Sequence, residues 1–244
     1  YIQLADKIIV DTYTSLTEDL DILLDYLRDK EIVYASRRDL EGEAIDRIIE
    51  EARYRNIAIL VSGDPFIATT HDAIRVEAYK KSVKVIVVNG LTIHSIIASR
   101  TGLQAYRFGK MITLTYPDSF KPYSTIETIY DNLSRNLHTL LLLDYRVDEG
   151  RYMSINEAVD ILLSLDDKRL LARVLAVGVA RLCFRDEYII ADRLIELKNY
   201  NYPKPPHSIV IVAKPHPIEL DNLFYICNLP RKLYEMYQSR REYP

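Results

Sequence analysis

The sequence predicts an α/β fold with two domains, and three observations lead to that prediction. Short runs rich in Ile, Val and Leu alternate with longer segments of helical period, which indicates a largely parallel sheet covered by helices. A length of 244 residues is enough for two modest domains. The segment from residue 117 to residue 122 holds two prolines, an aspartate and a serine, which is typical of a linker. We therefore expect α/β domains at 1–117 and 118–244.

In the first predicted domain, apolar β-branched runs mark strands and apolar residues three or four apart mark helices. Leu40, Ala44, Ile48 and Ala52 recur at every fourth position, which indicates one continuous helix. The predicted strands are Asp6–Val10, Glu31–Ala35, Ile57–Val61, Val83–Val88 and Met111–Tyr116. The predicted helices are Thr17–Asp29, Asp39–Tyr54, Thr69–Lys81 and Thr92–Gly102.

The same rhythm continues in the second predicted domain. Ser154 followed by Glu157 has the spacing of a capping box, which places a helix start at Ser154. The predicted helices are Ser124–Asn136, Ser154–Leu165 and Ile218–Cys227. The predicted strands are His138–Asp144, Arg173–Arg181 and Ser208–Val212, with one strand or a strand pair around Glu187–Ala191.

Composition argues against several functional classes. A net charge of −3 disfavours a protein that grips nucleic-acid backbone directly. Cys183 and Cys227 stand alone, which disfavours a disulfide framework or zinc site and fits a reducing cytoplasm. No apolar run approaches the roughly 18 residues of a membrane helix, so we expect no membrane association. The histidines lack metal-site spacing, and no nucleotide-binding loop or serine-nucleophile motif occurs, so we expect no metal centre.

The most informative stretch is Val61–His71, where a predicted strand stops on Gly63-Asp64-Pro65 and a helical pattern follows at once. In open α/β sheets, ligands bind at the carboxyl ends of strands, where such strand–turn–helix joints lie. The Asp64 carboxylate could bind a ligand or cap the helix that follows, and the residue types leave both possibilities open. Because the chain holds only 7 glycines, Gly63 indicates a turn or a close approach.

The next predicted strand ends in a similar way, at Asn89-Gly90-Leu91-Thr92-Ile93. If the two strands are neighbours, both turns face one crevice and Thr92 is available there. The alternative is an ordinary strand exit before a helix. His71 could simply pack on its helix, and His207, after two prolines, could line a domain cleft or be solvated.

Five motifs in order over nearly the whole chain resemble the diphthine synthase family. This family belongs to the tetrapyrrole-methylase-type superfamily of S-adenosylmethionine-dependent methyltransferases. The G-D-P turn is typical of the superfamily, while the A-T-T-H and G-R-Y-M runs point to this family. The motifs are Gly63–His71, Tyr106–Lys110, His138–Asp144, Glu149–Val159 and Pro205–Val210.

The resemblance implies methylation of the amino group on a carboxypropyl-modified histidine of translation elongation factor 2, a step in diphthamide biosynthesis. It also implies a homodimer, and two α/β domains with S-adenosyl-L-methionine bound in the cleft between them. The family's cofactor contacts carry over to Asp64, Ile67, Thr92, Ile93, Leu143, Leu182 and His207. Methyl transfer mainly requires alignment and an unprotonated amine, so we assign no catalytic acid or base. Tyr106, Tyr116 and Tyr123 are candidates to hold a methylated ammonium by cation–π attraction, although most of the 19 tyrosines must pack or lie on the surface.

One departure from the family concerns the start of the chain. The family's first strand ends in a Gly-Leu-Gly-Leu turn that contacts the cofactor, and nothing of that kind precedes Asp6. Tyr1–Ala5 resembles the end of the helix after that turn, so we expect an N-terminally truncated chain whose sheet lacks one strand. Two alternatives remain: a related methylase with a corrin or ribosomal RNA substrate, and a truncated, non-catalytic binding protein.

Overall fold

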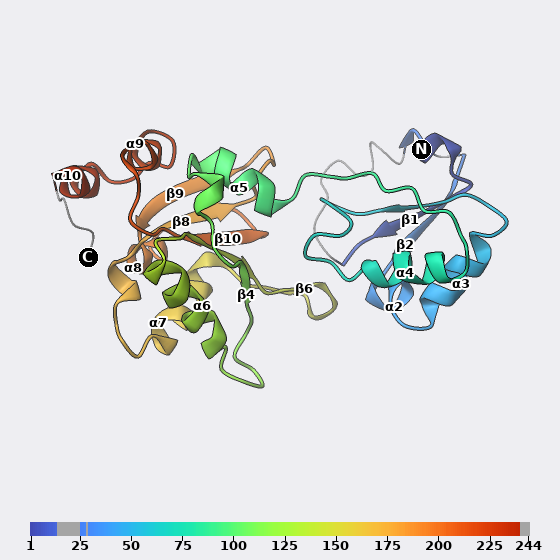
Figure 1. Ribbon diagram of the computed structural model, residues 1–244, viewed down its shortest axis with the longest axis horizontal. Helices are drawn as coiled ribbons and strands as arrows, with labels where there is room; N and C mark the ends of the chain where they lie inside the picture. The colour runs from blue at the N-terminus through green and yellow to red at the C-terminus, as the bar shows by residue number, and fades with distance from the viewer. Residues whose placement is uncertain (14–24, 28, 240–244) are drawn as a thin grey trace. The chain divides into compact units, whose positions relative to one another are not determined.

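The computed structural model describes residues 1–13, 25–27 and 29–239, in two compact units (Figure 1). Unit 1 comprises Tyr1–Thr92 with Val147–Glu149, and unit 2 comprises Ile93–Arg146 with Gly150–Pro244. The division therefore falls at residues 92 and 93, earlier than the linker expected near residue 118. The reason is that strand β4 (Ile112–Leu114) pairs in parallel with β5 (Thr139–Leu143), a strand of unit 2.

Unit 1 contains a parallel sheet of three described strands in the order β2-β1-β3. These are β1 (Lys7–Asp11), β2 (Glu31–Ala35) and β3 (Ile57–Leu60), preceded by a 3-10 turn, η1 (Ile2–Leu4). Three helices, α2 (Arg37–Leu40), α3 (Ala44–Glu51) and α4 (Asp72–Lys80), lie on one side of this sheet (Figure 1). The parallel arrangement predicted from the sequence is confirmed here.

The core of unit 1 follows the alternation of side chains along the central strand. Ile9 packs with Ile45 and Ile74 of the covering helices, whereas Ile8 and Val10 belong to a second cluster. Successive side chains of a strand point to opposite faces, so β1 contributes to both clusters. Burial on both faces explains why the middle of this strand, Ile8–Val10, is apolar at every position.

Two predicted elements of unit 1 differ in the structure. The helix expected over Asp39–Tyr54 is divided into α2 and α3, because Gly42 between them has a φ of +60°, in the left-handed region that glycine adopts most readily. The strand expected over Val83–Val88 is absent, since this segment pairs with no strand among the described residues. Only Val83 and Val85 pack against the core, so β-rich composition alone was misleading. The helix predicted over Thr17–Asp29 falls mainly outside the described residues.

Unit 2 contains a five-stranded sheet in the order β4-β5-β10-β8-β9. Its last three strands are β8 (Leu175–Ala180), β9 (Tyr188–Arg193) and β10 (His207–Ile211). Only the β4–β5 pair is parallel, so this sheet is mainly antiparallel, unlike the largely parallel sheet that alternation suggested. A short hairpin, β6 (Tyr145–Arg146) with β7 (Arg151–Tyr152), follows β5 and was not predicted.

Helices cover both faces of the unit 2 sheet (Figure 1). On one face, Leu141 and Ile209 pack with residues of α6 and α7, and on the other, Leu140 and Val210 pack with residues of α5, α9 and α10. The α7 start is confirmed: Ser154 and Glu157 form the reciprocal hydrogen bonds of a capping box. The helices are α5 (Ile93–Thr101), α6 (Tyr123–Ser134), α7 (Ile155–Leu165), α8 (Leu194–Leu197), α9 (Pro217–Tyr225) and α10 (Arg231–Ser239), with 3-10 turns η2 (Ala105–Arg107), η3 (Val147–Glu149, assigned to unit 1) and η4 (Leu171–Arg173). In the described part of the chain, no helix is both long and apolar enough to cross a membrane.

Candidate functional site

In unit 1, the carboxylate of Asp64 joins the two strand-exit turns that the sequence singled out. Its Oδ1 accepts a hydrogen bond from the backbone N–H of Phe66 at 2.9 Å, which fixes the G-D-P turn locally. Its Oδ2 accepts hydrogen bonds from Nδ2 of Asn89 at 2.9 Å and from the backbone N–H of Gly90 at 3.3 Å. The two turns therefore meet, although the strand that was expected to lead into the second turn is absent among the described residues.

Glycines make this meeting possible. A Cβ on Gly90 would lie 2.0 Å from the carbonyl oxygen of Gly63, far inside van der Waals contact. Gly63 itself has a φ of +93°, which side-chain-bearing residues rarely adopt. The two turns could not approach this closely with any other residue at position 90.

The Asp64 side chain is buried, and its pKa is lowered. The hydrogen bond from Asn89 and then the bond from the Phe66 N–H stabilise the ionised form, and together they outweigh the opposing effect of burial. Asp64 does not cap the next helix, because α4 begins at Asp72 with His71 as its N-cap residue. The capping alternative is therefore excluded, and the ionised carboxylate instead connects the two turns by hydrogen bonds.

The other predicted contacts of unit 1 lie in the same two turns. Ile67 follows Asp64 in the G-D-P turn, and its side chain is 47% exposed, so it is available to a ligand. Thr92 follows the Asn89-Gly90 turn and ends the first segment of unit 1, while Ile93 begins α5 in unit 2. Ile93 is partly buried and packs against the core of that unit.

In unit 2, the three remaining predicted contacts lie at one end of the sheet. Leu143 ends β5, Leu182 comes just after β8, and His207 begins β10. Because β10 runs antiparallel to both of the other strands, its first residue lies beside their last residues: His207 pairs with Ala180, and Ser208 pairs with Leu142. Sequence positions far apart are thus brought together.

The ring of His207 is held by two backbone groups. Its Nδ1 accepts a hydrogen bond from the N–H of Ile155 at 3.2 Å, and its Nε2 donates to the carbonyl of Pro203 at 2.7 Å. Burial lowers the pKa of this imidazole, although the Pro203 bond partly opposes that shift. Both nitrogens are engaged within the protein, so any ligand contact of His207 uses its backbone or the carbon edge of its ring.

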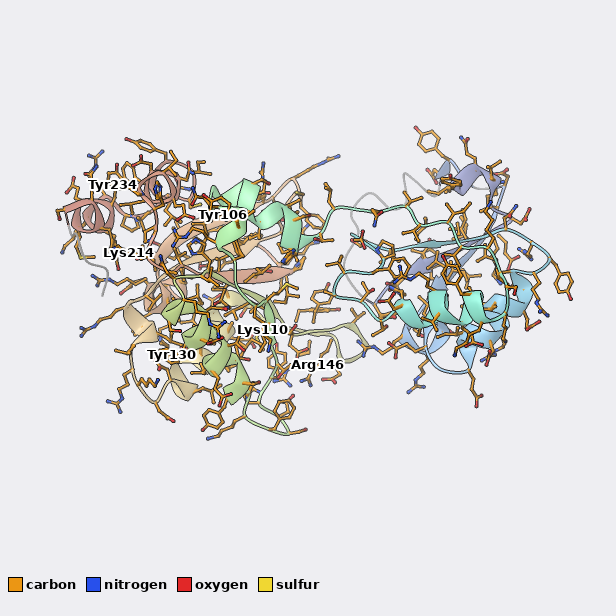
Figure 2. All side chains as sticks on the ribbon, in the orientation of Figure 1. Tyr106, Lys110, Tyr130, Arg146, Lys214 and Tyr234 are labelled. Atoms are coloured by element: carbon orange, nitrogen blue, oxygen red, sulfur yellow. The ribbon has the colours of Figure 1, made fainter. Side chains whose placement is uncertain are left out.

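The three tyrosines considered as ammonium-binding groups differ in their surroundings. The guanidinium of Arg151 lies 3.6 Å from the ring centre of buried Tyr116, so that ring already holds a cation of the protein. Tyr106 and Tyr123 are exposed, and Figure 2 labels Tyr106 among the side chains of unit 2. All three tyrosines belong to unit 2, whereas the two turns described above belong to unit 1.

Two features of the site were not predicted from the sequence. Asn89 is a hydrogen-bond partner of Asp64, a role that was not predicted for it. His71 is buried, and its ring lies between the G-D-P turn and Asp11 at the end of β1. Among the described residues, no group of three or more His, Cys, Asp or Glu side chains could hold a metal ion.

Comparison with known proteins identifies the family. The model of the Tetrapyrrole (Corrin/Porphyrin) Methylases matches residues 1–198. The chain belongs to the tetrapyrrole methylase family. A diphthine synthase of Staphylothermus marinus is 61% identical, over 98% of this chain and 91% of that protein. A diphthine synthase of Methanocaldococcus jannaschii is 36% identical, over 91% of this chain and 89% of that protein.

Solved structures agree with this placement within the tetrapyrrole methylase family. A crystal structure of diphthine synthase matches with a TM-score of 0.86 and 34% identity, and the match covers 96% of this chain and 90% of that one. Both the fold class and the resemblance predicted from the sequence are therefore confirmed, and the chain is a methyltransferase of the diphthine synthase type.

Proposed function

We propose that the protein transfers methyl groups from S-adenosylmethionine to the amino group of a carboxypropyl-modified histidine of translation elongation factor 2. The observation that supports this most strongly is the 61% identity to a diphthine synthase over 98% of the chain. The similarity to diphthine synthases favours this substrate over a corrin or a ribosomal RNA. We further propose that the protein acts in the cytoplasm as a homodimer and binds no nucleic acid directly.

The residues present fit such a cofactor. S-adenosylmethionine carries a cationic sulfonium, a cationic amino group and apolar surface, and it supplies an electrophilic methyl group. Asp64 provides an ionised carboxylate at the point where Gly63 and Gly90 let two backbone segments meet. Aliphatic side chains provide the apolar contacts, which suits a pocket with few polar groups. We propose that Asp64, Ile67 and Thr92 from unit 1, and Ile93, Leu143, Leu182 and His207 from unit 2, contact the cofactor.

The proposed chemistry places modest demands on the protein. Methyl transfer to an amine is an in-line displacement, and correct positioning can supply much of the rate enhancement. In this proposal, Asp64 and the apolar residues orient the donor, and water is kept from the reacting centre by aliphatic side chains. The acceptor amine arrives unprotonated, so no residue of this chain needs to be a nucleophile.

Ile67 allows a direct test of the cofactor site, since its exposed side chain contributes little to the core. We expect Ile67→Ala to weaken binding of S-adenosylhomocysteine about tenfold, because an apolar contact of this size is worth roughly 1–2 kcal/mol. Val76→Ala on α4 is a matched control, since Val76 is 50% exposed and lies outside the proposed site. Isothermal titration calorimetry measures both affinities. Equal affinities for the two variants would remove Ile67 from the site.

The reaction itself can be followed on the protein substrate. Purified elongation factor 2 that carries the carboxypropyl group is incubated with the protein and S-adenosylmethionine, and mass spectrometry counts the methyl groups added. Failure to methylate while S-adenosylhomocysteine still binds would favour a non-catalytic or differently directed relative. Sedimentation analysis of the same preparation tests the homodimer.

A further inference from the structure

The polar residues of the A-T-T-H run form hydrogen bonds within unit 1. The hydroxyl of Thr69 donates to the carbonyl of Pro65, four residues earlier in the same turn. The hydroxyl of Thr70 donates to Glu41 at 2.8 Å and lies 3.2 Å from the hydroxyl of Tyr13, from which it accepts. This run therefore fastens the G-D-P turn to its surroundings.

His71 contributes the connection to the central strand. Its Nδ1 lies 3.2 Å from the carbonyl oxygen of Pro65, and a carbonyl oxygen can only accept, so Nδ1 carries a proton and donates. On the other side of the ring, Nε2 lies 3.3 Å from Oδ2 of Asp11, an electrostatic contact outside hydrogen-bond geometry. His71 is 3% exposed, so the ring is enclosed between these two partners.

Asp11 is itself well fixed. It is the last residue of β1, the central strand of the sheet, and it is buried. Its Oδ1 accepts a hydrogen bond from the backbone N–H of Tyr13 at 2.9 Å. The order of contacts therefore runs from β1 through Asp11 and His71 to Pro65, which follows Asp64 directly.

We propose that His71 is a positioning residue for the cofactor. Through the Pro65 carbonyl it holds the turn that presents Asp64 and Ile67, and its buried ring fills the space between that turn and Asp11 at the end of β1. This inference rests on the proposed role of the G-D-P turn as part of the cofactor site. It assigns His71 no contact with cofactor or substrate, because the ring is buried and both of its nitrogens face protein groups.

Two substitutions of His71 separate positioning from packing. Asparagine can place its Nδ2 near the position of the histidine Nδ1 and keep the donor to Pro65, whereas leucine fills similar space without a donor. We expect His71→Leu to weaken S-adenosylhomocysteine binding about tenfold, in keeping with loss of one buried hydrogen bond. We expect His71→Asn to restore affinity to within about threefold of the wild type. Ile74→Val, which trims a buried residue of α4 in the same unit, controls for general loosening of the core and is expected to leave affinity unchanged.

Hydrogen exchange provides a readout that needs no cofactor. The amide of Phe66 bonds to Asp64 within the turn, and we expect its exchange to be faster in His71→Leu and close to wild type in His71→Asn. Affinity and exchange unchanged in His71→Leu would overturn the inference, as would His71→Asn behaving like His71→Leu. If the wild-type protein bound no S-adenosylhomocysteine, the proposed function would fail. If the wild type and His71→Leu bound S-adenosylhomocysteine with equal affinity, only the role of His71 would be overturned.

Discussion

Glu219 on α9 offers the strongest stability prediction, because its fully buried carboxylate accepts hydrogen bonds from several sides. Nε2 of His138 lies 3.0 Å away, and the backbone N–H groups of Gln104 and His216 donate at 2.9 and 2.7 Å. The guanidinium of Arg107 also donates to it. This cluster links three parts of unit 2 that are distant in sequence.

The protonation states follow from the donors and acceptors. Nδ1 of His138 accepts a hydrogen bond from the N–H of Ala213 at 3.1 Å, so the ring proton lies on Nε2 and faces Glu219. Burial raises the pKa of Glu219, but the hydrogen bonds from His138, Gln104 and His216 lower it by a larger amount, to about 2. Glu219 is therefore ionised in the folded protein down to low pH.

The expected magnitude comes from that shift. A pKa lowered from 4.5 to about 2, at about 1.4 kcal/mol per pKa unit, corresponds to about 3 kcal/mol of folding stability. Breaking a buried ion pair by removing one partner costs roughly 3–5 kcal/mol, which agrees. In Glu219→Gln, the amide nitrogen would face donors instead of accepting from them, so we expect about 3 kcal/mol of destabilisation at neutral pH.

The pH dependence gives the prediction its sign. Because the folded-state pKa is depressed, the stabilisation is present above the unfolded-state pKa of 4.5 and is lost as pH falls toward about 2. The stability difference between wild type and Glu219→Gln should therefore shrink below about pH 4.5. Urea unfolding at a series of pH values, followed by tyrosine fluorescence and circular dichroism, measures this difference.

Glu127→Gln is the control, since Glu127 is exposed on α6 and has no hydrogen-bond or ion-pair partner within the described ranges. Equal stability of wild type and Glu219→Gln at neutral pH, or a difference that stayed constant with pH, would refute the reasoning.

Two further substitutions test the turns and the helix cap. Gly90→Ala places a Cβ 2.0 Å from the Gly63 carbonyl, so we expect calorimetry to show at least about a tenfold loss of S-adenosylhomocysteine affinity. Gly42→Ala is the control, because its Cβ would meet no atom within 4 Å, and we expect this substitution to change stability alone. Equal affinities of the two variants would contradict the close approach of the turns. Ser154→Ala removes the side-chain cap of α7 and should lower stability by about 1 kcal/mol in urea unfolding. Ser164→Ala, on the exposed face of the same helix, should change stability little, and similar losses in both would argue against the cap.

The sequence predicted most local elements because their signals are local. Strands such as Leu175–Ala180 are buried apolar runs, and α7 begins at a recognisable cap. The division of the helix at Gly42 was also visible, as a glycine within the helical pattern, but periodicity on both sides of it outweighed that signal. What local pattern could not supply was a pairing partner, which is why Val83–Val88 was assigned as a strand.

Strand direction in unit 2 was not predictable for a specific reason. Strands β8 and β9 are joined by residues 181–187, whose left-handed positions are Arg181 and Cys183, with φ of 54° and 69°. Hairpins are normally recognised by Gly, Asn or Asp at such positions, and none of these occupies them here. Without that signal, alternation of strands and helices favours a parallel sheet.

The candidate site shows the same division between local and long-range information. The G-D-P turn was predicted because strand, glycine and carboxylate are adjacent in sequence, whereas Asn89 and Asp11 reach it only through the fold. The structure also separates two kinds of residue within this one motif. The hydroxyls of Thr69 and Thr70 and Nδ1 of His71 form hydrogen bonds inside unit 1, whereas Ile67 exposes nearly half of an apolar side chain. Because a packed side chain needs no ligand and an exposed isoleucine is costly in water, substitution of Ile67 should affect cofactor affinity alone, while substitution of His71 should affect both affinity and the order of the turn.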